Sequence, residues 1–424
     1  MSDRETLEQL QECLNSTIAE ERVAALEKLG DYGEAGLELA ARSLHDEIEW
    51  VREVACKRFV TRSDLIFLLS QGVQTWNKWR AITVYLDGWE ADLSGVDLRG
   101  KDLKKVNFRE CNLRGADLSG ADLSGAKLYK TDLREADLSN ANLSGANLSR
   151  ANLEGSILTE TNLQEVNFKR TNLSEFDFSD RYFYKINFSG ANLSYTKFDG
   201  ALLRRTRFTK ANLYGVDFTN IKLDRTTFER ASFERANLTG CNLKSINLKS
   251  AKMNNAELEG ADLSSANLSD VDFSTKVMNN VNFSRANLKR ANFKNSTLDG
   301  LNFSEAKLQN SDLQSANLQG ANFDRARLKG ANLEGTLATG MSAIEADFTG
   351  CRVGDADWSG ANLIGADLSQ IYFNRVNLKN ADLMGANCYN TALWESDLTG
   401  ANLFGIELSH IHFWNSTMPD GTKQ

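Results

Sequence analysis

Few residues in this chain are of the types that carry out catalysis or bind metal ions. The three histidines are His45, His410 and His412, and the last two occupy different positions of the local repeat, so they need not share a face. The six cysteines include no CxxC pair, whereas zinc sites and disulfide frameworks are recognised by such spacings. No phosphate-binding glycine loop or triad spacing is present either. The sequence therefore predicts a protein that is not an enzyme and holds no cofactor or metal.

The cysteines instead follow a five-residue repeat that dominates the chain. Cys111, Cys241 and Cys351 stand at its first position, where alanine is usual, and act there as small apolar fillers. The repeat, which begins ADLSG VDLRG, runs without insertion from residue 91 to residue 415. Its third positions are those whose numbers end in 3 or 8, and nearly all of them are Leu or Phe. These residues are the candidate core.

A period of five fits neither regular element. Five residues advance an α-helix by about 500°, and an odd period would turn a plain strand over at every repeat. A short extended piece followed by a corner solves the problem, because positions one and three then both point inward. Position two, usually Asp or Asn, points outward, and positions four and five, often Ser-Gly, form the turn.

Phenylalanine indicates how many corners close one coil. It recurs at every tenth residue from Phe168 to Phe228, and again from Phe273 to Phe303. Like residues stack only if a coil has an even number of walls. Four walls, with one repeat on each, satisfy this requirement, although the period alone leaves other even numbers open.

The array resembles the pentapeptide-repeat family, whose consensus A(D/N)LXX it matches over about three quarters of the chain. The resemblance implies a mainly β fold, a right-handed quadrilateral β-helix solenoid of about 16 coils. It also implies a candidate partner, because some members of the family imitate duplex DNA and bind DNA gyrase, protecting or inhibiting it.

The first part of the chain has helical periodicity instead. The segment DEIEWVREVACKRF, with Asp46, Val51, Arg52 and Ala55, resembles half of a HEAT repeat, and residues 21–30 resemble it more weakly. We expect an α-helical HEAT-like domain over 1–72, a leader and N-terminal cap of the solenoid over 73–90, the β-helix over 91–415 and a tail over 416–424.

The leader is rich in tryptophan. It is similar to the segment that precedes the array in bacterial pentapeptide-repeat proteins, a likeness carried by Gly72, Trp76, Asn77, Trp79 and Arg80. A solenoid must cover the open end of its first coil, and Trp76, Trp79 and Trp89 suit such a lid. A ligand pocket formed by these tryptophans is the alternative.

The repeat lapses in two ways. Lys101, Arg181 and Lys276 stand at inward first positions, where an unpaired charge is costly, so we expect bulges or side chains that reach back to solvent. Residues 336–345 place Ala338 and Ala343 at the centres, and this segment is the expected site of an irregular coil or loop.

Two outward-facing sets of residues are candidate sites. In a four-walled coil, apolar residues at position four stack on two opposite walls, with a tyrosine between them: Ile364, Met384 and Phe404 on one wall, Trp394 and Trp414 on the other, and Tyr389 between. Such a concentration indicates an interface, although packing under the tail is the alternative. Lys185, Arg205 and Arg225 form a candidate basic ladder, which Glu165 and Asp224 interrupt; a solvated charged face is the alternative.

The distribution of charge limits the functions and partners that the sequence allows. The net charge is −8, unevenly spread, with +6 over residues 161–250 and −6 over residues 341–424. We expect a cytoplasmic, non-catalytic protein-interaction scaffold with no membrane segment, whose C-terminal end binds a protein or forms a homodimer. The near-neutral solenoid weakens the DNA gyrase alternative, and the absence of aromatic residues from the basic ladder argues against a nucleic-acid partner.

Overall fold

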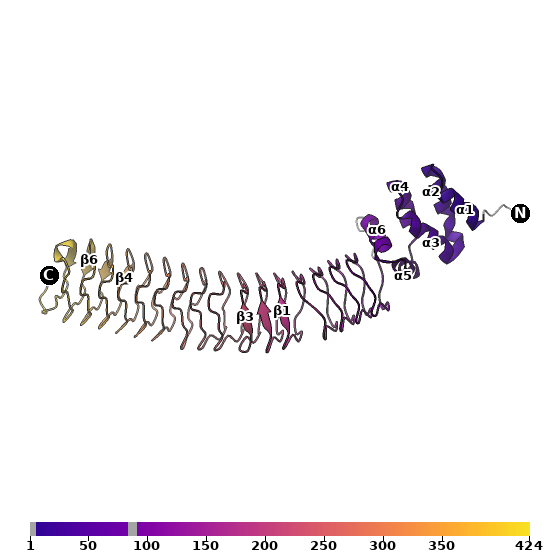
Figure 1. Ribbon diagram of the computed structural model, residues 1–424. Coiled ribbons are helices and arrows are strands. Elements are labelled where there is room, and N and C mark those ends of the chain that lie inside the picture. The colour runs from indigo at the N-terminus through magenta and orange to yellow at the C-terminus, as the bar shows by residue number, and fades with distance from the viewer. Residues whose placement is uncertain (1–5, 84–90) are drawn as a thin grey trace. The chain divides into compact units, whose positions relative to one another are not determined.

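The computed structural model of the protein describes residues 6–83 and 91–424. The chain forms two compact units: Met1–Leu173 with Tyr184–Ala191, called unit 1 here, and Ser174–Phe183 with Asn192–Gln424, called unit 2. In both units the chain winds into coils that stack on one another (Figure 1), as the repeat predicts. None of the helices in the described residues has the length and apolar composition needed to cross a bilayer.

The α-helices of the described residues and one 3-10 helix lie in unit 1 and precede its coils (Figure 1). They are α1 (Leu7–Leu14), α2 (Ala19–Lys28), the 3-10 helix η1 (Leu29–Tyr32), α3 (Gly33–Ser43), α4 (Glu49–Cys56), α5 (Arg62–Ser70) and α6 (Val73–Thr83). The starts of α2 and α4 repeat one arrangement. The Arg22 guanidinium donates to the Ser16 carbonyl and the Arg52 guanidinium donates to the Asp46 carbonyl, both at 2.7 Å. The HEAT-like character of these helices stays a prediction.

Helix α6 packs on the first coil, and its side chains take the place of a preceding strand. Asn77 Oδ1 accepts a hydrogen bond from the Asn107 N–H at 2.7 Å, and Trp76 Nε1 donates to the Asn107 carbonyl at 2.8 Å. The Arg80 guanidinium donates to the Arg109 carbonyl. On this wall of the first coil, the N–H and carbonyl of Asn107 and the carbonyl of Arg109, which lack a preceding strand, are thus satisfied by side chains. Trp89, the third tryptophan expected in the lid, lies outside the described residues.

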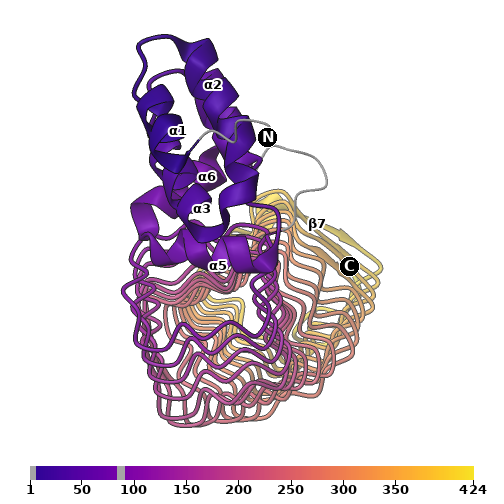
Figure 2. The ribbon, with the colours of Figure 1, turned by 90° about the vertical axis from the view of Figure 1, so that its right-hand side faces the viewer.

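Each coil consists of four repeats, one on each of four walls, because every bridge of the parallel ladder joins a residue to its counterpart four repeats later. Figure 2 looks along the coils and shows their four-sided outline. The walls are numbered here by their first repeats, 91–95, 96–100, 101–105 and 106–110, and every fourth repeat after them lies on the same wall. The first and third walls are opposite, as are the second and fourth.

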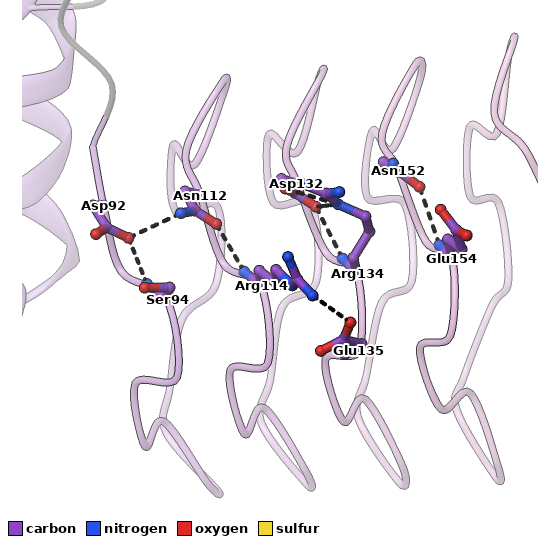
Figure 3. Close-up of polar contacts among 9 residues, drawn as sticks. All are labelled: Asp92, Ser94, Asn112, Arg114, Asp132, Arg134, Glu135, Asn152 and Glu154. Carbon is purple, nitrogen blue, oxygen red and sulfur yellow. Dashed lines mark hydrogen bonds and ion pairs between the residues drawn. The ribbon is translucent and has the colours of Figure 1, made fainter.

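The outward side chain at position two explains the preference for Asp and Asn. Asp92 Oδ1 accepts from the Ser94 N–H at 3.0 Å, and Asn112 Oδ1 accepts from the Arg114 N–H at 3.1 Å, which closes the turn (Figure 3). Asn112 Nδ2 also donates to Asp92 Oδ1 at 3.0 Å and so links two coils. Position five is left-handed, with φ 65° at Gly115, which explains the frequency of glycine there.

Within each unit the interior of the coils is lined mainly by Leu and Phe. Like residues stack along one wall, as the phenylalanine pattern predicts: the rings of Phe208 and Phe228 lie 4.9 Å apart at 10°, and those of Phe303 and Phe323 lie 4.8 Å apart at 4°. Burying such side chains stabilises by about 1.5–3 kcal/mol each before conformational entropy is subtracted.

Two short sheets form where position two is neither Asp nor Asn. On the third wall β1 (Tyr182–Tyr184), β2 (Leu202–Arg204) and β3 (Lys222–Asp224) pair in that order. On the first wall β4 (Arg352–Gly354), β5 (Tyr372–Asn374), β6 (Thr391–Trp394) and β7 (Ile411–Trp414) pair in order. The 3-10 helix η2 (Leu408–His410) precedes β7.

The expectation of an irregular coil at residues 336–345 is wrong. Leu337 bridges Asn317 and Asp357 in the regular register, and Ala338 and Ala343 are fully buried. The reason is a compensating residue one coil later on the same wall. Trp358 is fully buried, and its Nε1 donates to Thr336 Oγ1 at 3.2 Å, so a large side chain fills the space that alanine leaves.

The three inward charges behave differently from one another. Lys101 is exposed, and Arg181 is half-buried. Lys276 is half-buried, and its Nζ reaches the Ala256 carbonyl at 3.0 Å, while burial lowers the pKa of its ammonium group. The next residue, Val277, stands at the outward position two, is 71% exposed and bridges Thr297 in the regular register.

Candidate functional site

The aromatic residues predicted at position four of the first wall lie together at the end of unit 2. Trp394 of β6 is in register with Trp414 of β7, and their ring centroids are 5.6 Å apart. Tyr372 of β5 adds a third ring, 4.8 Å from Trp394. Trp394 and Trp414 remain 41% and 54% exposed. We call Tyr372, Trp394 and Trp414 the tryptophan face.

Tyr372 was missed by sequence reasoning because it occupies position two, where only position-four lapses were sought. The signal was available, since an aromatic residue at position two cannot accept the hydrogen bond that Asp or Asn accepts there. Beside Tyr372 the wall is hollowed into a groove of about 620 Å³, whose lining includes Arg352 and Gly354. Tyr372 also lines this groove and is 44% exposed.

The opposite, third wall carries the other predicted set. Ile364 is half-buried, Met384 is exposed and Phe404 is 76% exposed, and the repeats that hold them are bridged in order. Tyr389 lies on the fourth wall, between the two sets, with its ring 5.2 Å from that of His410. The structure thus brings Trp394 and Trp414 together on one wall, and Met384 and Phe404 on the opposite wall.

The tail leaves both sets exposed. The Gly400 N–H donates to the Pro419 carbonyl at 2.9 Å, and Thr417 bridges Asp397, so the tail first continues the second wall. It then folds back, with an antiparallel bridge between Thr417 and Lys423. Because these contacts follow the second wall, they do not cover the aromatic residues of the first and third walls.

An ion pair borders the tryptophan face. Arg375 Nε lies 2.7 Å from Asp355 Oδ1 across two coils of the first wall. The hydrogen bond and the charge of Arg375 hold the pKa of Asp355 below its usual range. The face is therefore bounded by groups that stay charged at neutral pH, a composition typical of the polar rim around an apolar interface core.

One residue of the predicted basic ladder, Lys185, is engaged in local pairs. In unit 1, Lys185 Nζ lies 3.1 Å from Glu165 Oε1 and 4.9 Å from the Tyr184 ring centroid. In unit 2, Arg205 and Arg225 occupy the left-handed position five, with φ 53° and 49°. Both arginines are exposed, and the pairing of Lys185 with Glu165 favours the solvated charged face that the sequence left open for this ladder.

The cysteines are packed in the interior apart from Cys13. Burial raises the pKa of Cys56, Cys241, Cys351 and Cys388 to about 12, which keeps these thiols protonated at neutral pH. No group of three or more His, Cys, Asp or Glu side chains in residues 6–83 and 91–424 is placed to hold a metal ion.

Two family models match the chain over most of its length. The model described as pentapeptide repeats (8 copies) matches residues 90–125, 102–140, 116–155, 141–180, 186–225, 344–380 and 380–415. The model described as a pentapeptide repeat region matches residues 226–303 and 277–342. The comparison with curated proteins gave no match.

Solved structures with this kind of repeat are similar over part of the chain. HetL, a pentapeptide-repeat protein involved in regulation of heterocyst differentiation in the cyanobacterium Nostoc sp. strain PCC 7120, is 23% identical, with 62% of this chain and 93% of HetL covered and a TM-score of 0.29. QnrB1, a plasmid-mediated fluoroquinolone resistance protein, is 18% identical, with 40% and 90% covered and a TM-score of 0.26.

A pentapeptide-repeat protein of the Arabidopsis thaliana thylakoid lumen is 33% identical. The match covers 31% of this chain and 68% of that protein, with a TM-score of 0.15. At these TM-scores none of the three superpositions bears on what the protein does.

Proposed function

Because the chain belongs to the pentapeptide-repeat family, we propose that it is a non-catalytic protein-interaction scaffold that binds a protein partner through the C-terminal end of its solenoid. The observation that carries this proposal is the tryptophan face. Proteins of this family are in general structural or interaction proteins, which agrees with a binding role. The regular coils would supply the rigid support, and the departures from the repeat would supply the contact residues.

The tryptophan face presents exposed rings to solvent. Trp and Tyr are the residues that most often dominate binding energy at protein interfaces. Here Trp394 and Trp414 stand on paired strands with register Trp394↔Trp414, so the backbone that carries the rings is already ordered before binding. Met384 and Phe404 on the opposite wall offer a second contact, either for the same partner or for a second copy of this chain.

The test compares two double variants. Trp394→Ser with Trp414→Ser removes the tryptophan face, whereas Tyr195→Ser with Tyr214→Ser is a matched control. Tyr195 and Tyr214 form another ring pair at 5.3 Å on the same wall, outside the C-terminal end. The measurements are molar mass by light scattering and quantitative mass spectrometry of proteins that co-purify from the native host.

We expect the tryptophan variant to lose a partner or to fall in mass while the tyrosine variant keeps both. Phe404→Ser, measured in the same way, shows whether the opposite wall also contributes to binding. If all three variants match the wild-type protein in mass and in co-purifying proteins, the scaffold proposal for this end is wrong.

Binding of DNA gyrase is the second candidate function, and one observation favours it. On the second wall, the outward positions of residues 216–340 carry Asp217, Glu257, Glu259 and Asp299 and no cation. An anionic wall is what imitation of duplex DNA requires. A supercoiling assay with purified gyrase tests the candidate: inhibition, or protection from a fluoroquinolone, supports it, and no effect at a large molar excess of this protein excludes it.

A further inference from the structure

The fourth wall of unit 2 carries an excess of positive charge that is independent of the C-terminal end. Seven successive repeats, from 206–210 to 326–330, stack on this wall, as the bridges that run from Arg207 through Lys307 to Arg327 show. Their outward positions hold nine cations: Arg207, Lys210, Arg230, Lys249, Lys289, Arg290, Lys307, Arg327 and Lys329. The same positions hold two acids, Glu229 and Asp270, so the net charge is +7. We call these seven repeats the basic wall.

Most of this charge is unpaired within the described residues. Arg290 forms an ion pair with Asp270 at 2.7 Å, and Arg230 lies 4.0 Å from Glu229. The other seven cations form no ion pair with the part of the chain that the structure describes, and all of them except the half-buried Lys249 are exposed. The wall therefore presents a positive field to solvent that the protein itself does not neutralise.

The neighbouring residues point to the chemistry of the ligand. The remaining ten outward positions of the basic wall are Thr, Asn, Ser, Gln and one Gly, and none is apolar or aromatic. Protein interfaces depend on aromatic and apolar anchors, which this wall lacks. Lys and Arg among Ser, Thr, Asn and Gln are instead the side chains that contact phosphate oxygens of nucleic acids.

We propose that the basic wall binds the phosphate backbone of duplex nucleic acid without reading its sequence. Seven coils at about 4.8 Å each span roughly 30 Å, close to one helical turn of about 34 Å in B-DNA. The wall has no rings on which unpaired bases could stack, so a duplex fits it better than a single strand. The acidic second wall, on the opposite side of the same coils, would restrict the duplex to one side.

This charge separation is invisible to counts along the sequence. Residues 251–340 are neutral as a segment, yet they include Lys289, Arg290, Lys307, Arg327 and Lys329 on one wall. A sequence window mixes four walls, whereas the fold sorts every fourth repeat onto the same wall. Lys185, Arg205 and Arg225, the ladder whose lack of aromatic residues argues against a nucleic-acid partner, belong to the third wall and not to the basic wall.

The experiment uses the full chain and a fluorescein-labelled DNA duplex of mixed sequence, followed by fluorescence anisotropy. The test variant carries three substitutions together, Lys289→Gln, Lys307→Gln and Lys329→Gln. The control variant also carries three, Lys244→Gln, Lys252→Gln and Lys294→Gln, and removes the same charge from exposed lysines on the first and third walls. Both variants change two residues at position four and one at position two, so their structural effects are matched.

We expect the wild-type protein and the control variant to bind the duplex with similar affinity at about 50 mM salt, and the test variant to bind at least about tenfold more weakly. If seven phosphates are contacted, log K should fall with log salt with a slope of about −6, and the test variant should reduce this slope by about 2–3. Scrambling the duplex sequence should leave the affinity unchanged.

Three outcomes would overturn the proposal. The first is no binding by the wild-type protein at low salt. The second is an equal loss in the test and control variants, which would indicate an effect of net charge alone. The third is tighter binding of a labelled poly-glutamate peptide than of the duplex, which would make the wall a site for acidic proteins. Circular dichroism of each variant confirms that loss of binding is not loss of fold.

Discussion

The side-chain oxygen of Asn77 accepts a hydrogen bond from the backbone N–H of Asn107 at 2.7 Å. One coil further on, the N–H of Lys127 on the same wall donates to the backbone carbonyl of Val106 at 2.8 Å. A helical side chain thus occupies the place that a backbone carbonyl occupies in later coils. The cap of the solenoid therefore supplies specific hydrogen bonds that a preceding coil would otherwise supply, and it also covers apolar surface.

Asn77→Ala should therefore loosen the first coil. The Asn107 N–H would lose its acceptor, and an unsatisfied polar group in a partly buried place costs about 1–3 kcal/mol. We expect faster hydrogen exchange at Asn107, with little change in coils far from α6, because repeat proteins open locally. Asn77→Asp is the control, since it keeps the acceptor and loses only the bond from Nδ2 to the Lys105 carbonyl. Equal exchange in the alanine variant and the wild-type protein would contradict this role.

Ala338 and Trp358 should behave as a complementary pair. They occupy successive repeat centres of one wall, and both are fully buried. Trp358→Leu alone leaves a cavity, and Ala338→Leu alone overfills the coil, so each should destabilise by about 1–4 kcal/mol. The double variant restores the usual Leu stack and should lose less than the sum of the single variants. Urea unfolding of the four proteins measures this coupling, and strict additivity would refute it.

This pair also shows which part of the structure the sequence could predict. The period of the repeat is enough to predict the coil, because the third position of each repeat faces the interior whatever its neighbours are. The regularity of residues 336–345 depends on Trp358, which lies outside this segment and contacts it only once the next coil has formed. The same limit applies to the surface. Trp394 and Trp414 share position four in repeats that are four apart, which the sequence shows directly, whereas Tyr372 joins them from another position of its repeat.

Thiol reactivity should distinguish Cys13 from the other cysteines. Cys13 is exposed, whereas the remaining five are buried, and burial raises the pKa of Cys388 to about 12. Because the thiolate is the reactive form, we expect an aromatic disulfide reagent to modify one thiol in the native protein and six after denaturation. Cys13→Ser should abolish the native reaction. Rapid native labelling of further cysteines would show that the coils open more readily than their packing indicates.

The ion pair between Asp270 and Arg290 should make a pH-dependent contribution to stability. The hydrogen bond from Arg290 and the charge of its guanidinium hold the pKa of Asp270 below its usual range. A carboxyl group whose folded pKa is lowered stabilises the folded state above its unfolded pKa, and this stabilisation is lost as pH falls through the folded pKa. The difference in unfolding free energy between the wild-type protein and Asp270→Asn should therefore be constant near neutral pH and vanish in acid.

Salt provides an independent check on the same pair. Asp270 and Arg290 are partly exposed, so their attraction should weaken at high ionic strength as well as at low pH. Asp299→Asn is a control, because Asp299 lies on the acidic second wall and forms no ion pair within the described residues. Urea unfolding at neutral and acidic pH, each at low and high salt, measures all three proteins. A difference between wild-type and Asp270→Asn that persists in acid would show that the asparagine acts through packing and not through the charge of Asp270.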